Sequence, residues 1–119
     1  MFRRAFLVGA GGLGIAGLHR FITEWYQRPD SEYIDSLSLG ELSETIHIRF
    51  TADDERREQI HQYLTYHLES GEIDEVHLMD ARRTRLSIDA PDDIDAHGLA
   101  LVDGDGEPIE DHEFDFGVI

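Results

Sequence analysis

The sequence predicts an α+β domain, in which a single amphipathic helix packs on a mostly antiparallel sheet of four to five strands. Two observations predict this fold. Apolar residues recur at helical spacing within residues 51–71, and the segments on either side alternate apolar and polar residues at the period of a strand. An N-terminal apolar helix, serving as signal or anchor, is expected before this domain. We therefore expect an export signal or membrane anchor over residues 1–22, a linker over 23–35 and the small α+β domain over 36–119.

The helix is expected to begin at Thr51, because a threonine hydroxyl can accept a hydrogen bond from a free backbone N–H of the first turn. Gly71 is a natural stop at its carboxyl end. Between the two, one stripe of residues falls at positions i, i+3, i+4, i+7 and i+8 and would face the sheet. The stripe consists of Ile60, Tyr63, Leu64, His67 and Leu68.

Strands are predicted on both sides of this helix. Alternating patterns predict strands at 46–50, 76–79, 85–88 and 114–118, and a short apolar run predicts another at 99–102. Leu37 and Leu39 indicate an earlier strand or a turn. The residues Asp103, Gly104, Asp105 and Gly106 tolerate positive φ and predict a hairpin turn. The first strand, the helix and the next strand are compatible with a right-handed parallel crossover.

The first twenty residues have the composition of a transport signal. Arg3 and Arg4 are followed by Phe6 and Leu7, within an apolar stretch over 5–18 that is diluted by glycine. This segment resembles a twin-arginine (Tat) export signal of a haloarchaeal-type acidic protein. The resemblance implies an exported protein that is extracellular or anchored to the outer face of the cytoplasmic membrane. The alternative is a short membrane anchor or a buried helix. A helix over 5–18 spans only about 21 Å of a hydrocarbon core of about 30 Å, but Phe21, Ile22, Trp25 and Tyr26 could prolong the contact through the membrane interface.

The same segment contains a glycine pattern, 9–14, that matches the dinucleotide-binding fingerprint. That fingerprint requires a buried strand before it and an acidic residue at the end of a second strand about twenty residues later. Two arginines precede the glycines, and Pro29 interrupts the following polar stretch. We therefore expect no nucleotide at these glycines. No other cofactor is expected either.

Composition restricts the function further. The chain carries 26 acidic residues against ten basic ones, all of them arginine, for a net charge of −16. Such a surface repels phosphates, so a nucleic-acid partner is not expected. The absence of lysine and the abundance of acids are typical of halophilic proteins, because molar salt screens charge repulsion beyond roughly 3 Å. With no cysteine, disulfides, thiolate nucleophiles and cysteine-ligated metals are excluded.

Histidine provides the candidate metal ligands. His47 and His77 lie on the polar sides of their predicted strands, where neighbouring strands could bring them together with an acid such as Asp89 or Asp115. None of the seven histidines has a close ligand spacing, so solvated histidines are the favoured interpretation and a metal-binding protein or metal-dependent enzyme is the alternative.

No catalytic pattern is recognisable, and an enzyme is therefore less expected than a binding protein. Arg49, Met79 and Arg85 would face outward beside the two histidines and form a surface that a partner could cover. The cluster Arg82, Arg83 and Arg85 is expected to form intramolecular ion pairs, with carboxylate recognition as the alternative. We expect an exported or membrane-tethered accessory domain that binds a protein or associates with itself.

Overall fold

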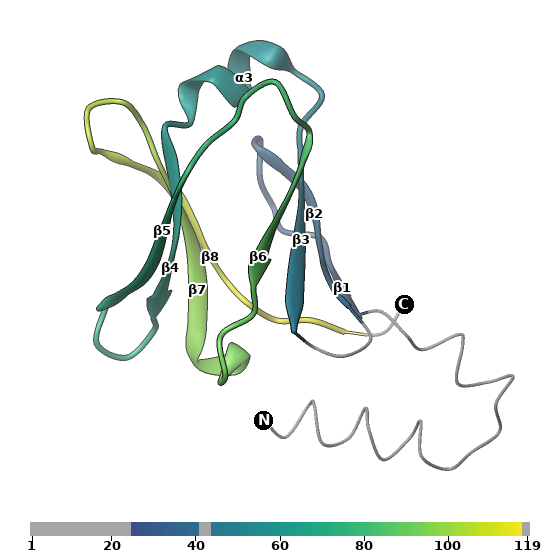
Figure 1. The fold of residues 1–119 in the computed structure, drawn as a ribbon, viewed down its shortest axis with the longest axis vertical. Helices are drawn as coiled ribbons and strands as arrows, with labels where there is room; N and C mark the ends of the chain where they lie inside the picture. The colour runs from purple at the N-terminus through teal and green to yellow at the C-terminus, as the bar shows by residue number, and fades with distance from the viewer. Residues whose placement is uncertain (1–24, 41–43, 118–119) are drawn as a thin grey trace, which may run out of the picture.

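The structure is a computed structural model that describes residues 25–40 and 44–117, and these residues form two antiparallel sheets packed face to face (Figure 1). The first sheet has the strand order β1-β2-β3-β6 and the second has the order β5-β4-β7-β8. The elements are β1 (Trp25–Gln27), β2 (Ile34–Leu39), β3 (Thr45–Phe50), α3 (Asp54–Gln59), β4 (Gln62–His67), β5 (Ile73–Leu78), β6 (Arg85–Asp89), η2 (Ile94–Ala96), β7 (His97–Val102) and β8 (Pro108–Glu113). The described chain is a β-sandwich.

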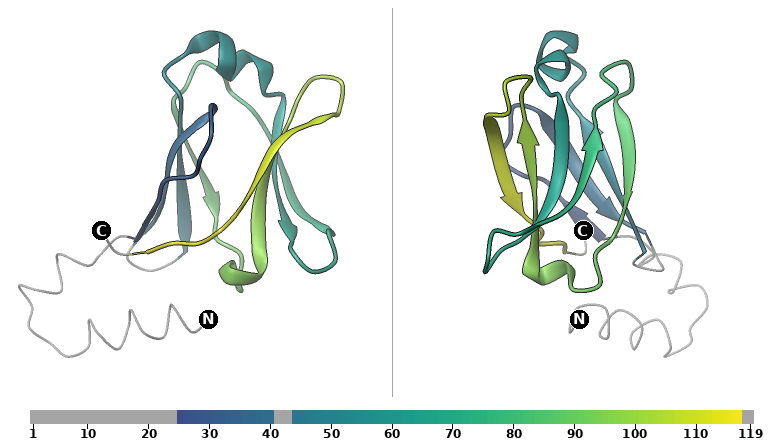
Figure 2. Two further views of the ribbon diagram at one scale, coloured as in Figure 1. Left: turned by 180° about the vertical axis from the view of Figure 1, so that it is seen from behind. Right: turned by 60° about the vertical axis from the view of Figure 1, so that its left-hand side comes forward.

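The predicted α+β fold with one amphipathic helix on a single sheet is therefore wrong. The only α-helix among residues 25–40 and 44–117 is the six-residue α3, which lies at one end of the sandwich and covers neither sheet (Figure 2). All strand pairs within the sheets are antiparallel, so the expected parallel crossover is also absent from the described chain.

The segment predicted as the carboxyl half of the helix is strand β4. Tyr63 and Thr65 are buried, whereas Leu64 and Tyr66 on the opposite face are only partly buried. This alternation has the period of two residues that a strand requires. The helix ends before it at Ile60, whose backbone is already extended (φ −85°, ψ 122°). Gly71 does not end a helix, and instead adopts φ 74° in the turn between β4 and β5.

Most predicted strands are confirmed. The segments 46–50, 85–88 and 99–102 lie in β3, β6 and β7, and the predicted turn at 103–106 joins β7 to β8, with φ 83° at Gly106. The last strand differs, because β8 ends at Glu113. Beyond it the chain crosses to the first sheet, where Gly117 and Tyr26 exchange backbone hydrogen bonds of 2.8 and 3.0 Å.

The described part of the chain begins with β1 at Trp25, within the stretch 23–35 that the sequence suggests as a linker. Both β1 and the start of β2 lie in that stretch, and Trp25 and Ile34 are buried in the core. The export signal or anchor expected over 1–22 lies outside the described residues. Within the described residues, no helix is both long enough and apolar enough to cross a membrane.

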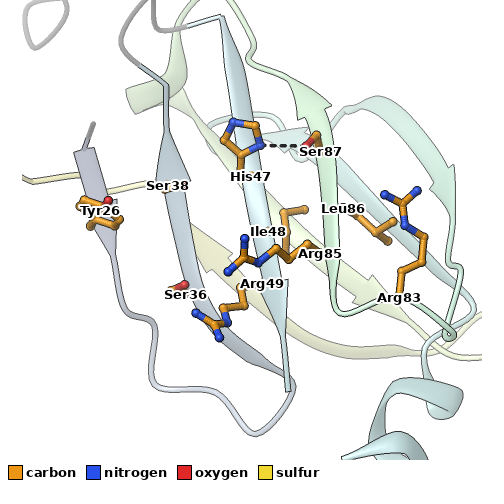
Figure 3. A pocket seen from close by; sticks show the side chains of 10 residues that line it. All are labelled: Tyr26, Ser36, Ser38, His47, Ile48, Arg49, Arg83, Arg85, Leu86 and Ser87. Atoms are coloured by element: carbon orange, nitrogen blue, oxygen red, sulfur yellow. Dashed lines mark hydrogen bonds between the residues drawn. The ribbon is translucent and has the colours of Figure 1, made fainter. Parts of the chain in front are cut away.

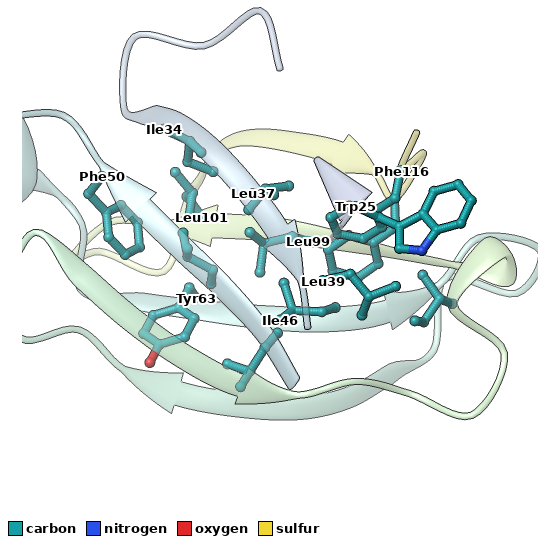
Figure 4. Packing of buried hydrophobic residues seen from close by; sticks show 14 of the residues in the cluster. Trp25, Ile34, Leu37, Leu39, Ile46, Phe50, Tyr63, Leu99, Leu101 and Phe116 are labelled. Carbon is teal, nitrogen blue, oxygen red and sulfur yellow. The ribbon is translucent and has the colours of Figure 1, made fainter. Parts of the chain in front are cut away.

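The core fills the space between the sheets (Figure 4). Alternate residues of both sheets point into it, and burial of each aliphatic or aromatic side chain stabilises the fold by about 1.5 to 3 kcal/mol. Phe114 and Phe116, from the segment that crosses between the sheets, are buried with them. The core residues are Trp25, Ile34, Leu37, Leu39, Ile46, Ile48, Phe50, Ile60, Tyr63, Ile88, Ile94, Leu99, Leu101, Phe114 and Phe116. With these side chains inside, the outer face of the first sheet is left mainly for polar groups, whereas strand β5 of the second sheet exposes Ile73, Val76 and Leu78.

Candidate functional site

A groove with a volume of about 550 Å³ lies on the outer face of the first sheet (Figure 3). All four strands of that sheet contribute to it, together with the turn before β6. Its lining contains hydroxyl, imidazole and guanidinium groups and no carboxylate. The lining residues are Tyr26, Ser36, Ser38, His47, Ile48, Arg49, Arg83, Arg85, Leu86 and Ser87. We call this the arginine groove.

Strand alternation explains why polar side chains gather here. In β3, Ile46 and Ile48 are buried, so His47 and Arg49 between and beside them project from the opposite face. The register then aligns each of them with neighbours on both sides. Arg49 lies opposite Ser36 in β2 and opposite Arg85 in β6. This places two guanidinium-bearing side chains in one row across the sheet.

A second row runs parallel to the first. It contains Tyr26, Ser38, His47 and Ser87, each opposite the next in the strand register. The Nδ1 of His47 lies 2.8 Å from the Oγ of Ser87, at hydrogen-bond distance. These groups can donate hydrogen bonds to a ligand that the neighbouring arginines attract.

The arginines of the groove have no acidic partner among the described residues, in contrast to Arg56, Arg57 and Arg82. Arg56 pairs with Glu32 at 3.0 Å, and the buried Arg57 pairs with Asp54. Within residues 25–40 and 44–117, the side chains of Arg49, Arg83 and Arg85 form no ion pair. Figure 3 shows Arg49 and Arg85 extending over the sheet in the direction of Ser36, whereas Arg83 lies apart on the far side of β6.

The expectation of ion pairs in the cluster Arg82, Arg83 and Arg85 is thus confirmed for Arg82 only. Its Nε donates a hydrogen bond of 3.1 Å to Oδ1 of Asp80. This hydrogen bond lowers the pKa of Asp80 and raises the pKa of Arg82. Arg85 instead lies opposite another cation, Arg49, in the strand register.

A pair of like charges directly opposite each other in a sheet destabilises the fold by roughly 0.2 to 1 kcal/mol. An anion bound between Arg49 and Arg85 would remove this cost. Guanidinium groups present planar donor pairs that match a carboxylate or a phosphate in bidentate geometry. The arrangement is therefore suited to anion recognition.

The structure separates the two histidines expected as metal ligands. His47 lies in the first sheet, on the outer face. His77 lies in β5 of the second sheet, where its ring stacks on Tyr63 at a centroid distance of 5.1 Å and its Nε2 lies 3.3 Å from Oε1 of Glu75. Asp89, at the end of β6, is opposite Thr45. The residues proposed from the sequence are not brought together as a ligand set.

The expected partner surface is partly assembled. Arg49 and Arg85 lie side by side in the arginine groove, as the alternation of their strands predicts. Met79 does not join them, because it follows β5 and packs against the core, with its backbone N–H donating to the carbonyl of His61 at 3.0 Å.

Sequence reasoning did not identify a third group of residues. His67, Asp74 and His97 each offer one ligand atom, and the three atoms lie within 4.8 Å of one another. The sequence pattern places His67 in the stripe of a helix, and only strand pairing places it opposite His97. Only a correct assignment of β4 as a strand could have predicted this group from the sequence.

Comparisons with known proteins gave no match. No family model, curated protein or solved structure is significantly similar to this chain.

Proposed function

We propose that this β-sandwich is a binding domain that recognises carboxylates of a protein partner in the arginine groove. The observation that carries the proposal is the cross-strand pair Arg49 and Arg85, which has no acidic partner among the described residues although the chain has 26 acids. In so acidic a chain, two adjacent cations without an acidic partner are unexpected unless a ligand neutralises them. No catalytic role is needed to account for the groove.

A carboxylate suits the groove better than a polyphosphate or nucleic acid. The net charge of −16 repels an extended polyanion over its whole length. Salt screens that repulsion beyond about 8 Å at physiological strength and beyond about 3 Å in molar salt, so a single carboxylate at contact distance is governed by Arg49 and Arg85. The hydroxyls of Ser36, Ser38 and Ser87 beside them can hydrogen-bond the neighbouring peptide groups.

Titration with a synthetic tetraglutamate peptide tests this function, with arginine side chains observed by NMR. The Nε–H signals of Arg49 and Arg85 should shift on addition of the peptide, whereas that of Arg82, which already has a carboxylate partner, should not. A tetraglutamine peptide is the matched neutral ligand, and inorganic phosphate distinguishes carboxylate recognition from general anion binding.

Two variants with the same change of charge complete the experiment. Arg49→Gln should weaken tetraglutamate binding about tenfold or more, because one of two charge-assisted contacts is lost. Arg82→Gln, on a side chain that is 91 % exposed and outside the groove, should leave it unchanged. Equal weakening by both variants, or equal binding of tetraglutamine, would contradict the proposal.

For the cellular setting we propose the outer side of the cytoplasmic membrane, as an exported or tethered accessory domain in a salt-rich medium. The support comes from the sequence: Arg3, Arg4, Phe6 and Leu7 match the pattern of a twin-arginine signal, and lysine is absent from the acidic chain. Residues 5–18 would hold the domain at the membrane if the signal is not removed.

Self-association is a second candidate mode of action, and the edge strand β5, which pairs only with β4 among the described residues, favours it. In the edge strand β5, Ile73, Val76 and Leu78 are 55 %, 50 % and 71 % exposed, and an apolar edge strand is a template for pairing with another chain. Sedimentation at high salt tests this idea with Leu78→Lys, which should abolish a dimer if β5 forms it. A dimer that persists in this variant would argue against pairing through β5.

A further inference from the structure

We infer that His67, Asp74 and His97 form a site for a divalent transition-metal ion. The site lies on the inner side of the second sheet, at the end of the sandwich opposite α3, and is independent of the arginine groove (Figure 1). Each of the adjacent strands β5, β4 and β7 supplies one ligand. Strand pairing therefore builds the group from residues that are far apart in the sequence.

The two imidazoles are brought together by the register. His67 ends β4 and lies directly opposite His97, the first residue of β7. Their ring centroids are 4.3 Å apart at an interplanar angle of 48°. Two rings at this distance can each direct a nitrogen toward one ion. His67 lies two residues after the buried Thr65 and His97 lies two residues before the buried Leu99, so the core fixes the positions of both histidines.

The protonation of His97 is set by its surroundings. Its Nδ1 lies 2.6 Å from the carbonyl oxygen of Asp93, and a carbonyl can only accept, so Nδ1 carries the hydrogen. In the neutral ring the lone pair then belongs to Nε2. A histidine that ligates a metal characteristically donates its other N–H to a backbone carbonyl in this way. His97 is thus held in the tautomer that a metal needs.

Asp74 completes the group from the neighbouring strand. Its Oδ2 lies 3.9 Å from Nε2 of His97, whose side chain is only 6 % exposed. With a neutral ring, these two facing atoms are both acceptors, an arrangement that a cation between them would satisfy. The hydroxyl of the buried Thr65 lies 3.5 Å from the same Oδ2 and orients the carboxylate. His97 and Asp74 are therefore each held by a contact outside the site, with the carbonyl of Asp93 and the hydroxyl of Thr65.

The chemistry of the ligands indicates which ion fits. Neutral imidazole nitrogens select zinc and neighbouring transition metals, whereas calcium and magnesium prefer oxygen alone. A tetrahedral zinc ion with bonds of about 2.1 Å separates its ligand atoms by about 3.4 Å. Closure from 3.9 Å requires a small movement of Asp74, whose side chain is 37 % exposed. The fourth position would be open to water or to an external ligand.

The full-length chain is first treated with a chelator to remove bound metal. Zinc binding to this metal-free chain then tests the site. Calorimetry should give one zinc ion per chain in the presence of excess magnesium, which occupies the acidic surface without competing for imidazole. Cobalt in place of zinc should give the visible absorption of a tetrahedral nitrogen and oxygen site. The ¹⁵N signals of the His67 and His97 rings should move to metal-bound positions.

Variants distinguish this site from other histidines and acids. Asp74→Asn and His67→Gln should each weaken zinc binding about tenfold or more, and both are partly exposed positions that a fold tolerates. His47→Gln, on the first sheet, is the matched control and should bind as the parent does. The inference is overturned if the parent binds no zinc, if all three variants bind alike, or if His97 is found doubly protonated and paired with Asp74 while zinc is present.

Discussion

The Nε of Arg57 donates a hydrogen bond of 2.9 Å to the carbonyl oxygen of Ala81, and so joins α3 to the connection between β5 and β6. The same guanidinium donates to the carbonyl of Thr51 at 2.8 Å and pairs with Asp54. Arg57 is only 5 % exposed. One buried cation therefore closes this end of the sandwich by satisfying carbonyls of two segments that cross between the sheets.

Replacement of Arg57 by methionine should lower the free energy of unfolding by about 2 to 4 kcal/mol. The carbonyls of Ala81 and Thr51 would lose their donors, and each buried unpaired group costs about 1 to 3 kcal/mol. Urea denaturation measures the change. Arg56→Met, which removes an exposed ion pair with Glu32, is the control and should cost less than about 1 kcal/mol. Similar losses for both variants would show that Arg57 does not fasten the sandwich.

The sequence was sufficient for most strands but not for the fold class, and β4 shows why. Tyr63, Leu64 and His67 satisfy the helical spacing, yet Tyr63, Thr65 and His67 satisfy the strand spacing equally well. Thr65 is polar, so its burial against Leu99 could not be expected from hydropathy. The choice depends on pairing with β5 and β7, which is a property of the whole sheet and not of the segment.

The two candidate sites also differ in how far the sequence alone could predict them. Arg49 and Arg85 could be placed on one outward face because alternation within each strand is local, although their alignment across β3 and β6 required the register. The group His67, Asp74 and His97 was out of reach, since it depends on β4 being a strand between two others. The predicted ion pairs of the cluster Arg82, Arg83 and Arg85 are found only for Arg82 among the described residues, because the neighbour of Arg85 across the strands cannot be known from sequence distance.

Gly98 is the position where the second sheet should be most sensitive to a small substitution. A Cβ at this position would lie 2.8 Å from the carbonyl oxygen of His112 and 2.7 Å from the hydroxyl oxygen of Tyr66. The carbonyl oxygen of His112 belongs to the backbone of β8 and cannot move without distorting the strand pairing. We expect Gly98→Ala to lower the free energy of unfolding by about 1 to 3 kcal/mol, measured by urea denaturation.

Gly104→Ala provides the comparison for this substitution. Nothing lies within 4 Å of a Cβ at that turn position, so the change should remain within about 0.5 kcal/mol. A stability of Gly98→Ala equal to that of Gly104→Ala would mean that β7 and β8 pair more loosely than the structure shows.

Tyr66 should make stability fall at high pH. Burial, a hydrogen bond of 3.0 Å donated to Asp111 and the negative charge of Asp111 and Glu113 raise the pKa of Tyr66 from 10.0 to about 12. The folded state thus favours the neutral phenol. Its contribution to stability is fully present below about pH 10, where both states are neutral, and is lost as pH rises from about 10 through 12.

Urea denaturation across this pH range, with Tyr66→Phe beside the parent, measures the effect. The variant should lose less stability between about pH 10 and 12, because the group that ionises preferentially in the unfolded chain is gone. Some slope should remain, since burial also raises the pKa of Tyr63. Parallel curves for the two proteins would exclude Tyr66 as a source of the pH dependence.

Export through a twin-arginine route should depend on both guanidinium groups at the amino end. Replacing Arg3 and Arg4 together by lysine keeps the charge of the signal but removes the paired arginines that define it, so the variant should be retained inside the cell. Fractionation of cells with mass spectrometry of the N-terminus measures this, and an intact Met1 in the membrane fraction would indicate an anchor. Arg28→Lys, beyond the signal, should be exported like the parent. Undiminished export of the double variant would leave the twin-arginine pattern without a role, because a signal recognised only by its charge and its apolar stretch would tolerate lysine.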